Sequence, residues 1–320
     1  MQHHHCLFNT RNSSLLATYG FQCYSKLPDE FGWRRTNIDA ISINTLGSKI
    51  LRLVGIAITL STVFTSLTWA QQGYSGRLNK IIEQFENGEP SLVGEHWQLN
   101  DLEHNAFQVD EFESFLNEIE LKGASRPELT PIVRIPYEAN QDYGHYVKQM
   151  LDVGAMGIIL PQVKTPADVT KLVRAMRYPP QRGAEYPEPP GLRGWGPSAA
   201  IRVWNVESKE YASKADVWPL NPSGELLAIA MVETREIIDN IDAILQVPGL
   251  GGLLIGPADL SMALGVGNPG PNSNAPEVIE AIERVGAACK RHNALCGIYM
   301  RSDVEKRQEE GFMLFPSIAY

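Results

Sequence analysis

The sequence predicts a parallel α/β barrel of the (β/α)8, or TIM barrel, type. Two short apolar runs, Leu226–Val232 and Gly252–Ile255, flank a helical segment at Arg235–Gln246, which is typical of a β-α-β unit. Each run ends in a carboxylate, Glu233 or Asp259, beside small or turn-forming residues. Because parallel strands of a barrel all end on one face, we expect these two side chains to lie side by side there.

The paired carboxylates suggest a cation site on that face. Carboxylate oxygens, with water completing the shell, suit a hard divalent cation such as Mg²⁺ or Mn²⁺. A carboxylate at a strand end also often does no more than cap the next helix, so spacing alone leaves both interpretations of Glu233 and Asp259 open.

Length and composition limit the alternatives. A chain of 320 residues forms one large barrel or two small domains. Its hydrophobic content of 43% is ordinary for a soluble globular protein, and its net charge of -9 argues against nucleic acid as a partner.

An uncharged stretch, Leu53–Ala70, lies near the N-terminus. It follows Lys49 and Arg52 and ends in a small residue. A basic region, an apolar core and a small residue at the cleavage point are typical of a secretory signal. We therefore predict a signal peptide over 46–70 and an exported protein, periplasmic or secreted.

Two alternatives to a cleaved signal remain. Signals normally start at the initiator Met, but here residues 1–45 come first, and a start codon assigned too early would explain this leader, which we expect to be disordered. An apolar stretch of 18 residues also reaches the short limit for an uncleaved membrane anchor. A cytoplasmic location is the third possibility, and the barrel is assigned to 77–320.

The remaining elements follow from periodicity and breakers. Arg77–Glu86 has an apolar face and is ended by Asn87-Gly88, which predicts an amphipathic helix. Ser91–Leu99 is predicted as a strand. The other predicted helices are 109–121, 142–153, 165–176, 207–215, 276–292 and 303–310, and the other strands are 131–135, 156–160, 294–299 and 311–317.

Two further segments carry expectations of their own. The Pro- and Gly-rich loop 182–197 is expected over the active face, where Arg193, Gly194 and Gly196 could approach a carboxylate ligand. Cys289 and Cys296 are taken as core positions, because nothing in the sequence marks them as a disulfide or a nucleophile.

Two strand-end motifs carry polar chemistry. In Asp101-Leu102-Glu103-His104 an Asp and a His are three residues apart just after a strand. In Ile132-Val133-Arg134-Ile135-Pro136 an Arg lies near a strand end. Taken singly, such a His is most often a surface residue, and such an Arg most often pairs with a carboxylate.

The motifs DLEH, VRIP, VETRE and IGPADLS occur in this order, each at a predicted strand end. Together they resemble the HpcH/HpaI aldolases, which are metal-dependent class II pyruvate aldolases with a (β/α)8 barrel of the phosphoenolpyruvate/pyruvate type, in the citrate lyase beta-like superfamily. The resemblance covers roughly Arg77 to the end of the chain.

The resemblance implies a role for each site residue. Glu233 and Asp259 would hold Mg²⁺, Mn²⁺ or Co²⁺. His104 would be the general base, oriented by Asp101, and Glu103 would make a structural hydrogen bond. Arg134 would contact the keto oxygen of a 2-oxo acid and stabilise its enolate. The substrate-binding residues would be Arg134, Met231, Gly256, Pro257 and Ala258.

The implied reaction is reversible cleavage of a 4-hydroxy-2-oxo acid to pyruvate and an aldehyde. One alternative is a lyase of the same superfamily that acts on a CoA thioester. The other is an exported, non-catalytic protein that binds a 2-oxo acid.

The sequence departs from the family in three places. Only six residues separate Gly94 from Asp101, too few for a helix, so the first β-α unit is expected to be reduced or replaced. The chain stops at Tyr320 without the last helix, which in the family is often exchanged between the subunits of a homo-oligomer. Where many members carry Gln, this chain has Met231, whose side chain cannot donate a hydrogen bond.

Overall fold

The computed structural model describes residues 76–105, 126–299 and 304–316, single positions at 112, 114 and 116, and two short strands near the N-terminus. The chain divides into two compact units, Met1–Gln71 and Gln72–Tyr320. In the first unit β1 (His5–Leu7) pairs antiparallel with β2 (Gln22–Tyr24). The predicted signal peptide lies outside the described residues. Among the helices that are described, none is long and apolar enough to span a membrane.

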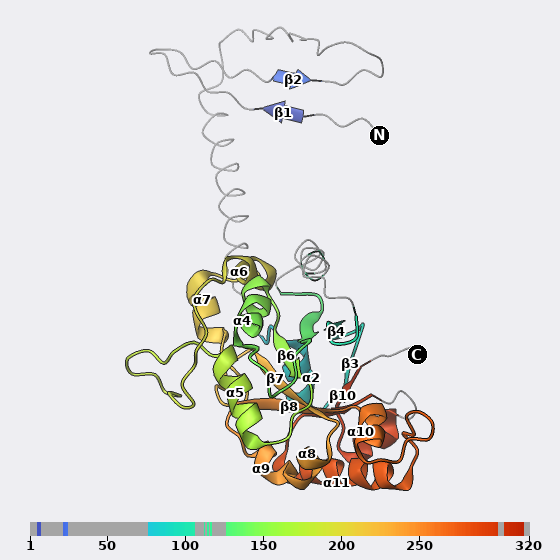
Figure 1. Cartoon of the computed structure of the whole chain (residues 1–320). Helices are drawn as coiled ribbons and strands as arrows, with labels where there is room; N and C mark the ends of the chain where they lie inside the picture. Colours follow the sequence, from blue (N-terminus) through green and yellow to red (C-terminus); the bar gives the residue numbers. More distant parts are fainter. Residues whose placement is uncertain are drawn as a thin grey trace, which may run out of the picture. The chain divides into compact units, whose positions relative to one another are not determined.

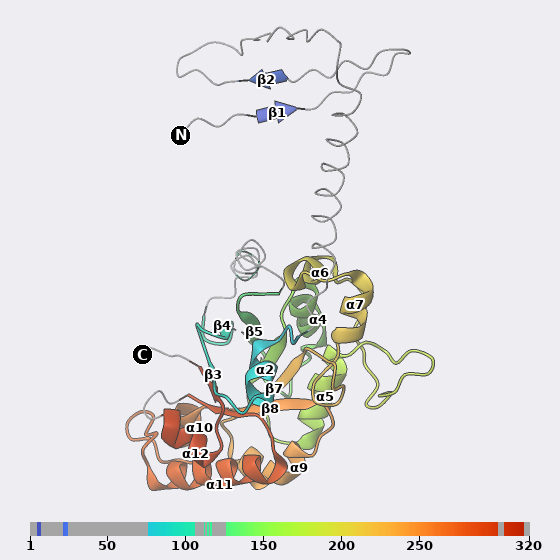
Figure 2. The same ribbon diagram turned by 180° about the vertical axis from the view of Figure 1, so that it is seen from behind.

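The second unit is built on an eight-stranded parallel sheet with the order β3-β10-β9-β8-β7-β6-β5-β4. Figures 1 and 2 show the strands inside this unit, with helices α5, α8, α9 and α11 outside them. The two ends of the order meet through a bridge between Val93 and Trp97, so the sheet is a nearly closed barrel. The predicted TIM-type fold is confirmed. The strands are β3 (Ser91–Leu92), β4 (Trp97–Asp101), β5 (Thr130–Arg134), β6 (Gly157–Leu160), β7 (Leu227–Val232), β8 (Leu250–Ile255), β9 (Cys296–Ile298) and β10 (Leu314–Phe315).

The predicted helices lie close to their expected bounds, whereas α6 and α10 were not predicted. The segment 235–246 differs, because Asn240 ends one short helix and begins the next. Most of the predicted helix 109–121 lies outside the described residues. The described helices are α2 (Lys80–Glu86), α4 (Gly144–Val153), α5 (Pro166–Met176), α6 (Ser198–Trp204), α7 (Ser208–Lys214), α8 (Arg235–Asp239), α9 (Ile241–Leu245), α10 (Pro257–Ala263), α11 (Pro276–His292) and α12 (Val304–Glu310).

The first β-α unit is reduced, as the spacing predicted. The single strand expected over 91–99 is divided into β3 and β4 by a tight turn, and no helix lies between them. Gly94 in this turn has a φ of +80°, a left-handed conformation that glycine adopts without a steric penalty. The barrel therefore begins with two strands joined directly.

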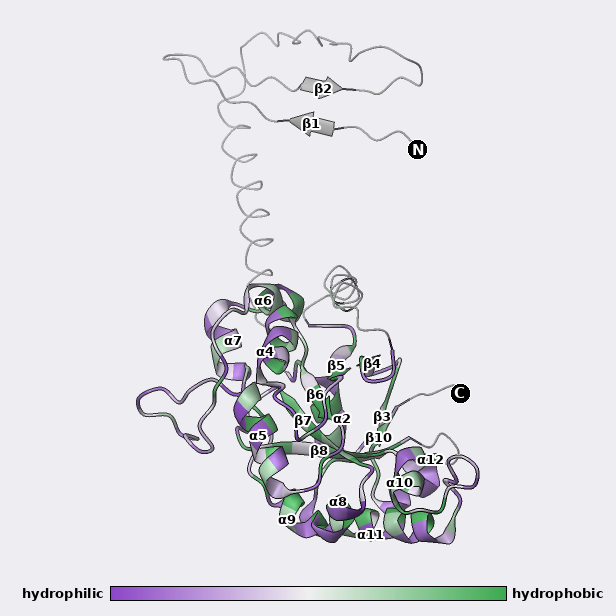
Figure 3. Cartoon of the chain, in the orientation of Figure 1, coloured by the Kyte–Doolittle hydropathy of each residue, from purple (hydrophilic) through white to green (hydrophobic). Residues whose placement is uncertain are grey.

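Alternate residues of the strands fill two apolar layers. In β7, Leu227, Ile229 and Met231 belong to a cluster inside the barrel, whereas Ala228, Ala230 and Val232 belong to a second cluster under the helices. A strand buried on both faces needs an uninterrupted apolar run, and every residue of the segment 226–232 is apolar. Figure 3 shows this hydrophobic interior and the more polar helices around it.

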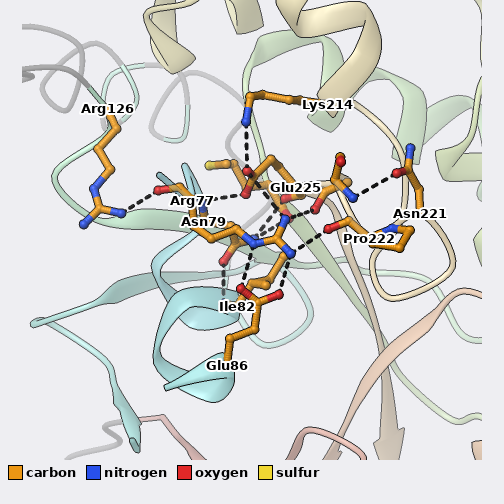
Figure 4. Close-up of polar contacts among 12 residues, drawn as sticks. Arg77, Asn79, Ile82, Glu86, Arg126, Lys214, Asn221, Pro222 and Glu225 are labelled. Atoms are coloured by element: carbon orange, nitrogen blue, oxygen red, sulfur yellow. Dashed lines mark hydrogen bonds and ion pairs between the residues drawn. The ribbon is translucent and has the colours of Figure 1, made fainter. Parts of the chain in front are cut away.

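Helix α2 is anchored at the end of the barrel opposite the strand carboxyl ends. The backbone N–H of Asn79 donates to the Glu225 carboxylate (2.9 Å), and its side-chain amide donates to the Glu225 carbonyl (3.0 Å). Lys214 and Arg77 lie 3.4 and 3.8 Å from the same buried carboxylate, and Figure 4 shows these groups meeting around Glu225. Burial raises the pKa of Glu225, and the cations and N–H donors oppose that rise.

A disulfide joins Cys289 at the end of α11 to Cys296 at the start of β9. The cysteines occupy core positions as predicted, but sequence analysis did not identify the disulfide between them. Asn293, with a left-handed φ of +48°, turns the chain back so that the two Cα atoms lie 6.2 Å apart, within reach of a disulfide. Both residues are buried, and closing such a loop contributes about 2–3 kcal/mol in chain-entropy terms.

Candidate active site

One pocket of about 160 Å³ lies at the carboxyl ends of the barrel strands. It collects most of the residues predicted from the four motifs, although these come from four different strand ends. Its lining residues are His104, Arg134, Met231, Gly256, Pro257, Ala258, Asp259, Ser273 and Tyr299. The other two predicted residues lie next to this lining: Asp101 bonds Arg134, and Glu233 lies beside Gly256.

Arg134 lies at the back of the pocket and is almost fully buried. Its Nε and Nη2 donate to the two carboxylate oxygens of Asp101, at 2.8 and 2.5 Å. Its Nη1 lies 3.1 Å from Oε2 of Glu103. The ring of Tyr299 lies 5.6 Å from the guanidinium carbon, close enough for a cation–π contact. The guanidinium plane is therefore fixed by two carboxylates and an aromatic ring.

These contacts set the charges around Arg134. Partial burial would raise the pKa of Asp101, but the hydrogen bonds and charge of Arg134 outweigh burial and lower it. Burial raises the pKa of Glu103, because Arg134 and His104 compensate only in part. Burial would lower the pKa of Arg134, yet Asp101 and its neighbours raise it, so Arg134 is a permanent cation.

His104 faces the pocket with a half-exposed side chain, and its Nε2 lies 3.6 Å from Oε2 of Glu103. The sequence predicted that Asp101 orients this histidine. In the structure both oxygens of Asp101 instead face Arg134, and Glu103 is the carboxylate nearest to the His104 ring. The predicted structural role of Glu103 thus takes the form of an ion pair with Arg134.

Glu233 ends β7 and is buried. Its Oε1 accepts hydrogen bonds from the backbone N–H of Gln162 (2.6 Å) and from the Gln162 side-chain amide (3.2 Å). Burial raises the pKa of Glu233 to about 7; the Gln162 N–H opposes this rise, and the carboxylates of Glu103 and Asp259 add to it. Negative charge therefore accumulates where the motifs predicted a cation.

The helix-capping interpretation of the two predicted ligands does not fit the structure. Helix α8 is capped by Thr234, whose Oγ1 accepts from the N–H of Ile237, so Glu233 is not its cap. Asp259 lies in the first turn of α10, which has no side-chain capping bond. Both carboxylates are thus available for another purpose.

The donor set fits a hard divalent cation. Among the described residues no group of three or more His, Cys, Asp or Glu side chains is placed to hold a metal. Two carboxylates can still do so when water and substrate oxygens complete the shell, which is usual for Mg²⁺. The raised pKa of Glu233 is the physical sign of the fit, since a cation would stabilise the charged form that burial disfavours.

The prediction for loop 182–197 was wrong. Arg193 is buried against helices α4 and α7, where its Nη2 donates to Asp152 (2.9 Å) and to the Tyr211 hydroxyl (2.7 Å). The Tyr178 ring lies 4.6 Å from its guanidinium carbon. Neither Arg193 nor any other residue of this loop lines the pocket described above. The half-buried carboxylate of Asp152 and two tyrosines hold Arg193 on the outer layer of the barrel.

Three residues of the site were missed by sequence analysis. Tyr299 directly follows β9, and its place at a strand end was the available signal. Gln162 follows the predicted strand 156–160 by two residues and had the same signal. Ser273 lies in a polar turn region, and nothing in the sequence singled it out.

Comparison with known proteins agrees with this geometry. Residues 101–313 match the family described as HpcH/HpaI aldolase/citrate lyase. A hydroxypyruvate/pyruvate aldolase from Rhizorhabdus wittichii is 35% identical over 243 residues, covering 69% of this chain and 84% of that protein. A 5-keto-4-deoxy-D-glucarate aldolase from Citrobacter koseri is 28% identical over 218 residues, covering 68% of this chain and 73% of that protein.

The fold comparison points the same way. A structure titled as an HpcH/HpaI aldolase/citrate lyase family protein from Burkholderia cenocepacia superposes with a TM-score of 0.60 at 26% identity, covering 74% of this chain and 91% of that chain. The motifs, the barrel and the matched sequence range agree, and the chain belongs to the HpcH/HpaI aldolase/citrate lyase family.

Proposed function

We propose that this protein is a metal-dependent pyruvate aldolase, a carbon–carbon lyase that reversibly cleaves a 4-hydroxy-2-oxo acid to pyruvate and an aldehyde. The observation that carries the proposal is the pocket in which Arg134, His104 and Asp259 meet, with buried Glu233 behind it. Relatives named as aldolases support the reaction class.

Glu233 and Asp259 are the residues that would hold Mg²⁺, Mn²⁺ or Co²⁺. When bound, such a cation supplies Lewis-acid polarisation of the carboxylate and keto oxygens of the 2-oxo acid. Glu103, Glu233 and Asp259 bring negative charge together here, and a bound cation would offset it. The protein contributes the orientation of these ligands and a partly enclosed pocket.

His104 serves as the general base. It takes the proton from the hydroxyl on C4, the C3–C4 bond breaks, and the electron pair of that bond passes to C3 to form the enolate of pyruvate while C4 becomes the aldehyde carbonyl. The proton held on His104 then passes to C3 of the enolate, which completes pyruvate and restores the neutral base; the reverse step removes a methyl proton from pyruvate. Glu103, rather than Asp101, is the carboxylate closest to His104, with its Oε2 3.6 Å from the Nε2 of the ring.

Arg134 stabilises the enolate oxygen. Guanidinium carries five N–H donors, and the Asp101 carboxylate accepts one from Nε and one from Nη2. Nη1 forms an ion pair with Glu103 without a hydrogen bond, so donors remain for a substrate oxygen. Because the guanidinium group is already held in place, it needs little reorganisation when negative charge develops on the enolate oxygen.

One observation favours the non-catalytic alternative, a protein that binds a 2-oxo acid without turnover. Met231 is buried against the pocket at a position where it offers no hydrogen bond to a ligand. Turnover therefore has to be tested directly, and the test must not depend on knowing the aldehyde.

Exchange of the pyruvate methyl protons in deuterated water is that test, because it needs only enolate formation. We expect the full chain to exchange them in the presence of Mn²⁺ and not with a chelator. His104→Ala should slow exchange by about 100-fold or more, since a general base typically contributes that much. The methyl signal is followed by proton NMR.

The matched control is His145→Ala, which removes an exposed histidine on α4 outside the pocket and should exchange like wild type. A folded protein that binds Mn²⁺ without exchanging pyruvate would contradict catalysis and support the binding protein. Exchange of an acetyl-CoA methyl group in place of pyruvate would support the thioester lyase.

We also propose that the protein is exported through the apolar segment at 46–70. The disulfide between Cys289 and Cys296 supports this location, because disulfides persist in oxidising compartments and are rare in the cytosol. Protein recovered from its native source should begin at Gln71 and show no free thiol at either cysteine by mass spectrometry. A chain that retains Met1 and two free thiols would contradict export.

A further inference from the structure

Gln162 adopts a backbone conformation that is rare for its residue type. It follows β6 by two residues and has a φ of +55°, in the left-handed region. Only a few per cent of residues other than glycine have a positive φ. Such conformations persist where the surrounding structure holds them, and they cluster at functional sites.

The left-handed turn aims both donors of Gln162 at one oxygen. The backbone N–H lies 2.6 Å and the side-chain Nε2 3.2 Å from Oε1 of Glu233. A second bond ties the same two segments together, because Thr234 Oγ1 donates to the carbonyl of Val163 (2.8 Å). Two successive residues after β6, Gln162 and Val163, are therefore hydrogen-bonded to two successive residues after β7, Glu233 and Thr234.

The other carboxylate oxygen of Glu233 is directed toward the pocket wall. Its Oε2 lies 3.3 Å from the point where a side chain on Gly256 would begin, and Gly256 lines the pocket. The missing side chain leaves room beside Oε2. Because both Gln162 donors occupy Oε1, the carboxylate has one oxygen held by the protein and one oriented toward Gly256.

We infer that Gln162 is a positioning residue that fixes Glu233 so that Oε2 is presented to the divalent cation. The inference rests on the proposed function, which makes Glu233 a ligand. Met231, two residues before Glu233, offers no amide, and Gln162 brings one to this carboxylate from the neighbouring strand instead.

A purely structural role for Gln162 makes a different prediction. If the amide only satisfies a buried carboxylate, its removal lowers the stability of the fold and leaves cation affinity alone. If it positions Oε2, its removal weakens cation binding at nearly constant stability, because the backbone N–H still satisfies Oε1. The two roles are separated by measuring both quantities on the same variants.

Two variants remove the amide in different ways. Gln162→Met keeps a side chain of similar length without a donor. Gln162→Gly removes the side chain and adopts the left-handed conformation without strain. A loss of Mn²⁺ affinity in this variant therefore cannot be attributed to backbone strain. Gln246→Ala is the control, because Gln246 is an exposed glutamine on the outer layer whose amide donates to the Asp242 carbonyl.

The first readout is Mn²⁺ binding to the metal-free full chain, followed by the loss of the free Mn²⁺ signal in electron paramagnetic resonance. We expect both Gln162 variants to bind about 10- to 100-fold more weakly, the usual effect of losing a group that orients a metal ligand. Their thermal midpoints should stay close to wild type, and saturating Mn²⁺ should restore pyruvate exchange.

Unchanged Mn²⁺ affinity in both folded variants would overturn the inference while leaving the aldolase proposal in place. A wild-type chain that binds no Mn²⁺ would overturn the metal assignment itself, and the positioning role with it. A fall in stability without a fall in affinity would establish the structural role in place of the positioning one.

Discussion

Replacing Glu233 by Gln removes Mn²⁺ binding and, with it, metal-dependent pyruvate exchange. The substitution keeps the shape of the side chain and its acceptor for Gln162, but it deletes the only charge that β7 brings to the pocket. Because loss of an orienting neighbour already costs about 10- to 100-fold in affinity, loss of a ligand should cost at least about 100-fold. The measurements are Mn²⁺ titration and exchange of the methyl protons. Glu225→Gln is the control, since it neutralises an equally buried carboxylate near α2.

The same variant carries a pH signature in the metal-free protein. Glu233 has a pKa of about 7 in the fold against an ordinary value of 4.5. A carboxylate whose pKa is raised by folding stabilises the fold fully below 4.5, and this contribution is lost as pH rises through 7. The difference corresponds to about 3 kcal/mol.

The stability of wild type should therefore fall relative to Glu233→Gln between pH 4.5 and pH 7 and run parallel to it above that range. Urea unfolding of both proteins with a chelator present measures the difference. Identical pH profiles would show that ionisation of Glu233 does not lower the stability of the fold, which would contradict its raised pKa. Added Mn²⁺ should reverse the trend for wild type only, because binding a cation favours the ionised carboxylate.

The features of this site that could be predicted are those that depend on residues close together in the sequence. An uninterrupted apolar run fixes where a buried strand ends, so the amino-acid pattern alone could assign Glu233, Asp259 and Arg134 to one face of the barrel. The same reasoning found the shortened first unit, because six residues after Gly94 cannot hold a helix. Strand ends in a parallel barrel converge by geometry.

The part that could not be predicted depends on contacts between distant residues. Asp101 pairs with Arg134, 33 residues away, rather than with His104, because β4 and β5 place those two residues opposite each other in the sheet. Gln162 contacts Glu233 through a left-handed turn, and a glutamine in the sequence does not indicate such a turn. The Cys289–Cys296 bond likewise depends on how tightly the chain turns at Asn293.

Arg134→Leu should give the largest combined loss of stability and activity. The substitution leaves Asp101 and Glu103 partly buried without their cation, and breaking one side of a buried ion pair typically costs about 3–5 kcal/mol. Pyruvate exchange should fall by about 100-fold or more, because a fixed donor to the enolate oxygen is lost. Urea unfolding and proton NMR measure the two effects.

Two companion variants separate stability from chemistry at Arg134. Arg134→Leu combined with Asp101→Asn removes the unpaired carboxylate and should recover part of the lost stability, but no exchange. Arg134→Lys keeps the charge without the planar fork that contacts both oxygens of Asp101, so it too should recover stability more than exchange. Exchange near the wild-type rate in Arg134→Leu would contradict the role given to this residue. It would leave Arg134 as a structural cation that neutralises Asp101 and Glu103, and the enolate charge would then have to be stabilised at Glu233 and Asp259 alone.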